Sequence, residues 1–267
     1  MPRPLEILVC VKQVLDTQVS SEVLQVDGER LRVSGPGVPP VLDPYSLNAL
    51  KGALDLEAEG EATITVLNVG ANPSKGLLLK SLGAGADRLL ALRIPPAPEA
   101  LCDGLRTARQ LAALVRRAGH FDLVLAGRMG ADTSAGTTGP TLAALLGLPL
   151  VTMATRLQRE SETRLFVERL ASDAIERLSC PLPALVTVSS EIGELPPVSL
   201  LSLKEARSKP FEILEPGDVD LTEAPLGIEL VSLEKPSRER DCRMVSAEDA
   251  RLGGLRLVEV LRQEGVL

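Results

Sequence analysis

Residues 121–149 read FDLVLAGRMGADTSAGTTGPTLAALLGLP: an apolar run, a loop rich in glycine and hydroxyl side chains, and a second apolar stretch. The run Phe121–Ala126 is typical of a strand that is buried on both faces of a parallel sheet. We expect Gly127–Gly139 to be a loop, followed by a helix to about Leu146. This order of strand, glycine-rich loop and helix predicts one βα unit of an α/β fold.

The same alternation extends along most of the chain. We expect strands at Leu5–Val11, Ala62–Val69, Arg88–Leu92, Leu150–Ala154 and Pro183–Val188, and helices at Tyr45–Glu59, Pro73–Leu82 and Pro98–Ala118. Strands that alternate with helices at this spacing pair in parallel through right-handed crossovers. The expected fold class is therefore α/β, with a doubly wound and mostly parallel sheet.

Some segments depart from this alternation. Asp27-Gly28, within Gln25–Val33, suggests a hairpin turn between short strands. The partial alternation of Leu157–Leu170 and Ala174–Leu178 predicts an antiparallel excursion from the sheet.

The end of the chain also lacks the βα pattern. Glu191–Pro210 mixes prolines, leucines and basic residues without a core pattern, so we expect an extended arm. Ser246 is expected to cap a last helix that ends near Gln263. We therefore expect a nucleotide-binding α/β domain at 1–190 and a partner-recognition arm with a C-terminal segment at 191–267.

Composition excludes several classes of partner. The net charge is −7, which argues against a protein that binds nucleic-acid backbones. Aromatic residues are only 1% of the chain, which argues against recognition of bases by stacking. The apolar stretch before Lys12 is too short for a signal peptide or a membrane span, so we expect no membrane insertion and a cytoplasmic location.

The residues that most often carry metal or redox chemistry are scattered. Cys10, Cys102, Cys180 and Cys242 form no CxxC motif, and His120 is the sole histidine. We therefore expect no metal site, and buried free thiols in a reducing compartment. His120 is expected to be a surface or capping residue, because a lone histidine rarely catalyses. No serine–histidine–aspartate set and no GxSxG motif is present, which disfavours a hydrolase.

The loop Gly127–Gly139 is the candidate binding site. Glycines allow the backbone to approach a ligand, and hydroxyls with free amides at a helix N-terminus bind anions. An ordinary loop with threonine caps would have the same composition. The loop is neither GxxxxGK[ST] nor GxGxxG, so a P-loop kinase and a standard Rossmann dehydrogenase are disfavoured.

Two acidic residues allow two interpretations each. Asp43, with Pro44 behind it, is either a helix N-cap or part of a contact to adenine or ribose. Asp132 either holds a ribose hydroxyl or caps a turn.

Taken together, five stretches resemble the electron-transfer flavoprotein beta subunit and its nitrogen-fixation-associated relatives. They are VCVKQVLDT (9–17), LDPYSLNAL (42–50), LGAGADRLLAL (82–92), the 121–149 stretch, and LPALVTVSSEIGELPPVSLLSLKEARSKPFEI (182–213). The resemblance spans about residues 5–215. It implies an adenine-nucleotide alpha-hydrolase-like fold and an electron-carrier subunit, not an enzyme.

The resemblance also implies ligands and partners. The family pairs this subunit with an alpha subunit that carries FAD, and the beta subunit binds AMP, or a second FAD in electron-bifurcating relatives. Leu195 and Leu200 in the arm would dock an acyl-CoA or other dehydrogenase. The implied nucleotide-binding residues are Cys10, Asp43, Pro44, Tyr45, Ser46, Val69, Gly127, Arg128, Met129, Gly130, Ala131, Asp132, Thr133, Ser134, Ala135, Gly136, Thr137 and Thr138.

Two alternatives stay open at this point. One is a bifurcating flavoprotein whose beta subunit holds FAD. Two flavins per heterodimer would support this alternative, and one flavin would support AMP in this chain. The other is an independent adenine-nucleotide sensor of similar fold. The arm argues against the sensor, since a self-contained protein needs no exposed leucine- and proline-rich segment.

Overall fold

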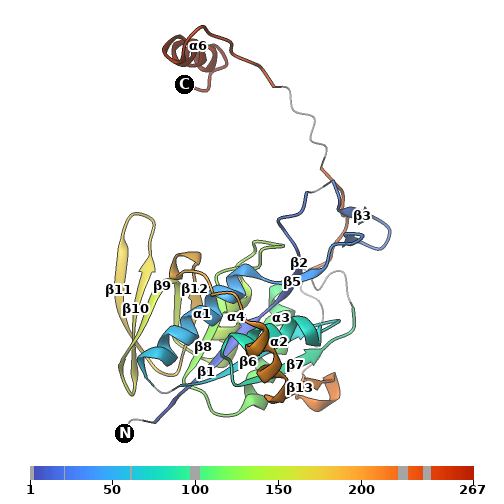
Figure 1. Ribbon diagram of the computed structural model, residues 1–267, viewed down its shortest axis with the longest axis vertical. Helices are drawn as coiled ribbons and strands as arrows, with labels where there is room; N and C mark the ends of the chain where they lie inside the picture. The colour runs from blue at the N-terminus through green and yellow to red at the C-terminus, as the bar shows by residue number, and fades with distance from the viewer. Residues whose placement is uncertain (1–2, 21, 61, 97–102, 222–227, 237–241) are drawn as a thin grey trace. The chain divides into compact units, whose positions relative to one another are not determined.

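The computed structural model describes residues 3–20, 22–60, 62–96, 103–221, 228–236 and 242–267. The chain divides into two compact units, Met1–Leu233 and Glu234–Leu267. The first unit contains the sheet, its helices and the arm (Figure 1). The division of roles at residue 190 stays a prediction.

A nine-stranded sheet organises the described part of the first unit, in the order β11-β10-β9-β12-β8-β1-β6-β7-β13. Its strands are β1 (Leu5–Val11), β6 (Ala62–Gly70), β7 (Arg88–Arg93), β8 (Leu123–Gly127), β9 (Leu150–Ser161), β10 (Arg164–Leu170), β11 (Ile175–Pro181), β12 (Ala184–Val188) and β13 (Phe211–Leu214). β1 pairs in parallel with both β6 and β8, so the strand order reverses at β1. The doubly wound, mostly parallel sheet is confirmed.

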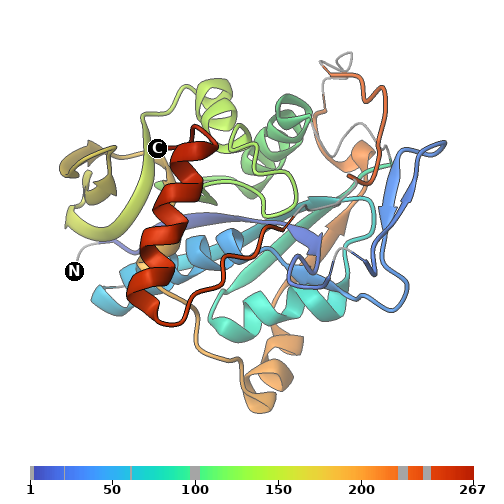
Figure 2. The same ribbon diagram turned by 90° about the horizontal axis from the view of Figure 1, so that it is seen from above.

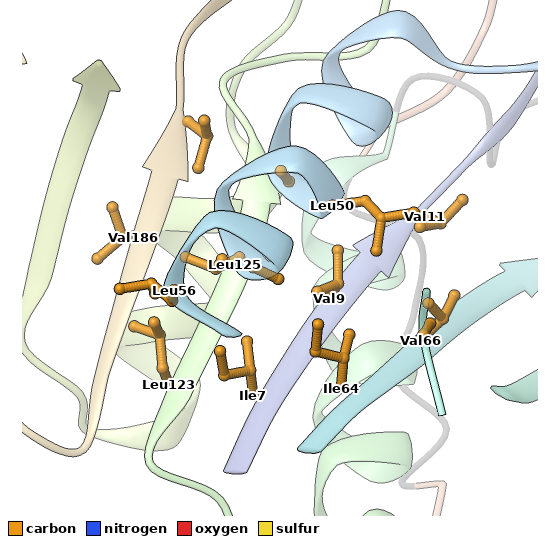
Figure 3. Packing of buried hydrophobic residues seen from close by; sticks show 14 of the residues in the cluster. Ile7, Val9, Val11, Leu50, Leu56, Ile64, Val66, Leu123, Leu125 and Val186 are labelled. Carbon is orange, nitrogen blue, oxygen red and sulfur yellow. The ribbon is translucent and has the colours of Figure 1, made fainter. Parts of the chain in front are cut away.

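Helices cover both faces of this sheet. Figure 2 shows α1 (Pro44–Glu59) and α2 (Lys75–Ala84), in blue and cyan, on one face, and α3 (Gly104–Ala118) and α4 (Thr138–Leu146), in green, on the other. Alternate residues of β1 supply the two cores: Ile7 and Val9 pack under α1, and Leu8 packs under α3 and α4. Leu50 and Leu56 of α1 lie over these strands in Figure 3. Burial on both faces explains why the strands are continuous apolar runs.

The antiparallel excursion is confirmed. β9, β10 and β11 form a meander through antiparallel pairs, while β9 joins β12 in parallel. Two small sheets lie outside the main one: β2 (Gln13–Leu15) with β5 (Pro40–Leu42), and β3 (Gln25–Asp27) with β4 (Arg32–Ser34). The β3–β4 pair confirms the hairpin at Asp27-Gly28.

Two predicted helix starts were wrong, because the polar cap decides the start. α2 begins after Ser74, whose hydroxyl accepts a hydrogen bond from Leu77 N, and not at Pro73. α3 begins after Asp103, and the expected start at Pro98 falls outside the described residues. In the second unit, α6 (Ala250–Gln263) is capped by Asp249 instead of Ser246, and none of its residues is buried.

The arm is more structured than expected. After the short 3-10 turn η2 (Ser190–Ile192), it forms α5 (Leu200–Glu205) and η3 (Ala206–Ser208), and then enters the sheet as β13. Ser199 caps α5 by accepting from Ser202 N. Among the described residues, no helix has the length and apolar character needed to cross a membrane.

Candidate binding pocket at the switch point

A pocket of about 290 Å³ lies beyond the carboxyl ends of β1, β6 and β8. This is where strand order reverses, and ligands of open α/β sheets bind at such a point. Most of the predicted nucleotide-binding residues line it: Cys10, Asp43, Ser46, Val69, Gly127, Arg128, Met129, Gly130, Thr133, Ala135, Gly136, Thr137 and Thr138. The others, Pro44, Tyr45, Ala131, Asp132 and Ser134, lie beside these residues in the chain.

One side of the pocket is built from helix N-termini. Thr137 is the N-cap of α4, but its side chain makes no capping hydrogen bond, so within the part of the chain that the structure describes the first amides of α4 have no side-chain acceptor. Gly104, the first residue of α3, packs against Thr137 so closely that a Cβ there would lie 2.2 Å from Thr137 Oγ1. Free amides with adjacent hydroxyls suit a phosphate group.

The other side of the pocket is apolar. Val69, Ile94, Pro95 and Leu111 line it from the ends of β6 and β7 and from α3. In the sheet order, β6 and β7 lie on the opposite side of β1 from β8. The pocket therefore has a polar end near β8 and an apolar end near β7, which matches a ligand with an anionic group and a flat apolar ring.

Asp43 fixes the wall between β1 and the loop. It is 1% exposed, and its two carboxylate oxygens accept from Ser46 N at 3.1 Å and from Ala131 N at 2.7 Å. Burial raises the pKa of this carboxyl, while the two backbone donors and the charge of Lys12 oppose the rise. Asp43 is thus both an N-cap and a tie between α1 and the loop, and its contact to an adenine or ribose stays a prediction.

Lys12 was missed by the sequence interpretation. Its Nζ lies 2.7 Å from Asp132 Oδ1, and the pair joins the segment after β1 to the loop after β8. A Cβ on Gly130 would lie 2.8 Å from Asp132 Oδ1, so the glycine leaves room for the pair. The available signal was that Lys12 directly follows a strand end at the switch point.

Arg128 is held by the first turn of α1. Its Cζ lies 5.0 Å from the centre of the Tyr45 ring, and its guanidinium donates to Tyr45 Oη at 3.3 Å. Its Nε is buried and has no hydrogen-bond acceptor among the described residues. Gly127 allows this contact, since a Cβ there would lie 2.6 Å from the carbonyl carbon of Tyr45.

The thiols differ more than expected. Cys10 and Cys180 are buried, but Cys242 is exposed, which corrects the expectation of buried thiols, and Cys102 falls outside the described residues. Burial raises the pKa of Cys10 to about 12. Cys10 is therefore a neutral, unreactive wall of the pocket. His120 is exposed and lies before β8, at the amino ends of the strands and away from the pocket. Its Nε2 is 2.8 Å from an Arg3 nitrogen.

The two predicted docking leucines have different environments. Leu200 is 87% exposed, and its neighbour Leu201 is 66% exposed. Leu195 is partly buried and packs against the hydrophobic core. The body of α5 is fixed to α2, because Val198 and Leu203 occupy the space above Gly83. Lys209 Nζ donates to three carbonyl oxygens at the end of α2, those of Leu82, Gly85 and Ala86.

These features define the class: a doubly wound α/β protein with a pocket at its switch point and a leucine-bearing arm. The chain matches the family described as the electron transfer flavoprotein domain over residues 32–219. It is 31% identical to the human electron transfer flavoprotein subunit beta, across 92% of this chain and 94% of the relative. It is 30% identical to the Clostridium acetobutylicum subunit beta, across 84% of this chain and 83% of that relative.

A third relative has a different description. The caffeyl-CoA reductase-Etf complex subunit CarD of Acetobacterium woodii is 31% identical across 84% of this chain and 83% of its own length. The chain belongs to the electron transfer flavoprotein family, as a relative of its beta subunits. In these broad terms it is an electron-transfer protein and not an enzyme in the ordinary sense.

Proposed function

We propose that this chain is the beta subunit of a heterodimeric electron-transfer flavoprotein and that it holds AMP in the switch-point pocket. The observation that carries the proposal is the polarity of that pocket. The uncapped start of α4 suits the phosphate, and the apolar wall around Val69 and Ile94 suits the adenine. We take the contacts to be structural: glycines and threonines predominate at the polar end, and Asp103 beside them is engaged as the N-cap of α3, where it accepts from Arg106 N.

Pocket size favours AMP over a second FAD. Ligand sites usually have volumes of roughly 300–1,000 Å³, and this pocket, at about 290 Å³, lies just below that range. A mononucleotide fits such a volume better than a dinucleotide does. FAD in this chain, with electron bifurcation, is therefore the second candidate.

The proposed partners follow from family and surface. We place FAD mainly on an alpha subunit, because the pocket here is accounted for by AMP. Leu200 and Leu201 form an exposed apolar tip, and such side chains act as anchors when a partner buries them. We assign this tip to an acyl-CoA or other dehydrogenase, a choice supported by the reductase complex named for the Acetobacterium relative.

The test is the nucleotide content of the pure complex. The chain would be co-expressed with its candidate alpha subunit, denatured, and the released nucleotides quantified by mass spectrometry. One AMP and one FAD per heterodimer is expected. Two FAD and no AMP would replace AMP by FAD in this chain, and no adenine nucleotide beyond one FAD would overturn binding at this pocket.

A further inference from the structure

The root of the arm, Ser189–Gly193, is held at both of its ends. Just before it, Val188 O accepts from Arg128 N at 2.9 Å. At its end, Gly193 O accepts from Asn48 Nδ2 at 2.7 Å. Ile192, between them, packs where α1 has a glycine: a Cβ on Gly52 would lie 2.9 Å from Ile192 Cδ1. The root is therefore tied to α1 and to the β8 loop, in addition to a bond from Ser189 N to Ala154 O of β9 at 2.8 Å.

Both elements that hold the root are also walls of the pocket. α1 contributes Ser46 to the pocket and is capped by Asp43, which also lines it, and the end of β8 with the loop after it contributes Gly127 and Arg128. The two walls contact each other, because Arg128 stacks on Tyr45 and Gly127 touches the Tyr45 backbone. A ligand that orders one wall therefore orders the other.

The charge on Arg128 reaches the root as well. Glu191 lies in η2 and accepts hydrogen bonds from Ser189 Oγ and Ser190 Oγ. The pKa of Glu191 is lowered, mainly by the hydrogen bond from Ser189 and to a smaller extent by the positive charge of Arg128. The structural connection of Arg128 to the root is therefore the backbone bond at Val188, and its charge contributes only weakly at Glu191.

We propose that occupancy of the switch-point pocket orders the docking arm, with Asn48 and Arg128 as the positioning residues that connect the two. The inference rests on the proposed function, since it takes AMP as the ligand. Binding that rigidifies the pocket walls lowers the entropy of the root attached to them, and two sites coupled in this way need no large change of shape. The exposed tip at Leu200 and Leu201 is then presented in fewer orientations, which favours a partner that must bury it.

Hydrogen exchange measures this coupling directly. The full-length chain with its alpha subunit would be depleted of nucleotide and compared with and without AMP, while bound AMP is quantified in the same samples. Exchange over residues 194–208 is expected to slow by at least about fivefold with AMP, the lower end of usual coupling between sites. Exchange over β10 and β11 is the internal reference, because these strands lie at the far edge of the sheet.

The variants separate coupling from stability. Asn48 is not among the described residues that line the pocket, so Asn48→Ala is expected to bind AMP. It should lose most of the protection ratio, which is the exchange rate over residues 194–208 without AMP divided by the rate with AMP. Asn48→Asp, which keeps the shape but removes the donor, serves if the alanine variant folds poorly. Asp55→Ala is the control on α1, since its carboxylate pairs with Lys51 only; it should keep the wild-type ratio.

The outcomes are distinct. If the role of Asn48 is merely structural, Asn48→Ala will speed exchange of the arm equally with and without AMP. A ratio in this variant that equals the wild-type ratio overturns the proposal. AMP that binds the wild type without slowing the arm also overturns the coupling while it supports the proposed function. Failure of AMP to bind the wild type overturns both.

Discussion

Lys12 and Asp132 connect the segment after β1 to the β8–α4 loop, with 2.7 Å between Lys12 Nζ and Asp132 Oδ1. Both side chains are partly exposed, at 39% and 25%, and exposed pairs contribute roughly 0.2–1 kcal/mol. A double-mutant cycle of Lys12→Ala and Asp132→Ala, by urea unfolding, should give a coupling energy in that range. The coupling should shrink at 1 M salt, because salt screens pairs of this exposure. A salt-independent coupling would contradict this description of the pair.

Gly127 makes a closer contact than any side chain would allow. A Cβ there would lie 2.6 Å from Tyr45 C and 2.7 Å from Tyr45 O. We expect Gly127→Ala to lower the free energy of unfolding by roughly 1–3 kcal/mol, the usual cost of overpacking, and to weaken AMP retention. Gly76→Ala is the control: apart from the helix's own backbone, no atom of the described residues lies within 4 Å of a Cβ there, so stability should rise by about 0.4–1 kcal/mol. Equal effects of the two substitutions would contradict the contact.

Leu200 and Leu203 lie one turn apart in α5 and should respond in opposite ways. Leu200→Ala should change the free energy of unfolding by less than about 0.5 kcal/mol, because the side chain is 87% exposed. It should nevertheless slow reduction of the complex by its dehydrogenase by about tenfold or more, as expected for an anchor. Leu203→Ala, which loses packing at Gly83, should cost roughly 0.5–3 kcal/mol in a thermal melt. Unchanged electron transfer in Leu200→Ala would remove this leucine from the docking surface.

The cysteines should label in a set order. Cys242 is exposed, so it should react with iodoacetamide in the native protein. Cys10 should react only after unfolding, because burial raises its pKa to about 12 and leaves almost no thiolate. Peptide mass spectrometry of protein alkylated before and after addition of guanidinium distinguishes the two sites. Native labelling of Cys10 would mean that this wall of the pocket opens.

Asp43 should make stability depend on pH in the acid range. Its pKa is raised by burial above the ordinary value of 3.8, so the folded state binds the proton more tightly than the unfolded state. The contribution is favourable below the unfolded pKa and is lost as pH rises through the folded pKa. Relative to Asp43→Asn, the wild type should therefore lose stability as pH increases through a window that begins near 3.8. Thermal melts between pH 3 and 7 test this sign, and a difference that grows with pH would contradict it.

Local pattern predicted most of the central sheet. Every residue of Leu5–Val11 except Glu6 is apolar, because one face of the strand meets α1 and the other meets α3 and α4. The loop Gly127–Gly139 was identified as a site because glycine and hydroxyl residues follow a strand directly. These signals are contained in short stretches, so a single sequence carries them.

Contacts between distant segments could not be predicted in this way. Asp43 ties to Ala131, and β13 pairs with β7 through Phe211 and Leu89, but neither contact has a signal within its own segment. The ion pair of Lys12 could not be predicted either, because its partner Asp132 lies in a loop far away in the sequence. The start of α2 depended on whether Ser74 or Pro73 set the boundary, which is a choice between two favourable local signals.

The arm leaves the sheet at β12 and returns to the same sheet at β13. Between its root and Pro210 it contacts α2 through Val198, Leu203 and Lys209. Because both ends of residues 194–210 are anchored to the same sheet, this segment can be exchanged as a unit. Under the proposed function, a chimera that carries a relative's residues 194–210 should fold with the rest of the sheet unchanged and should take on the donor's partner.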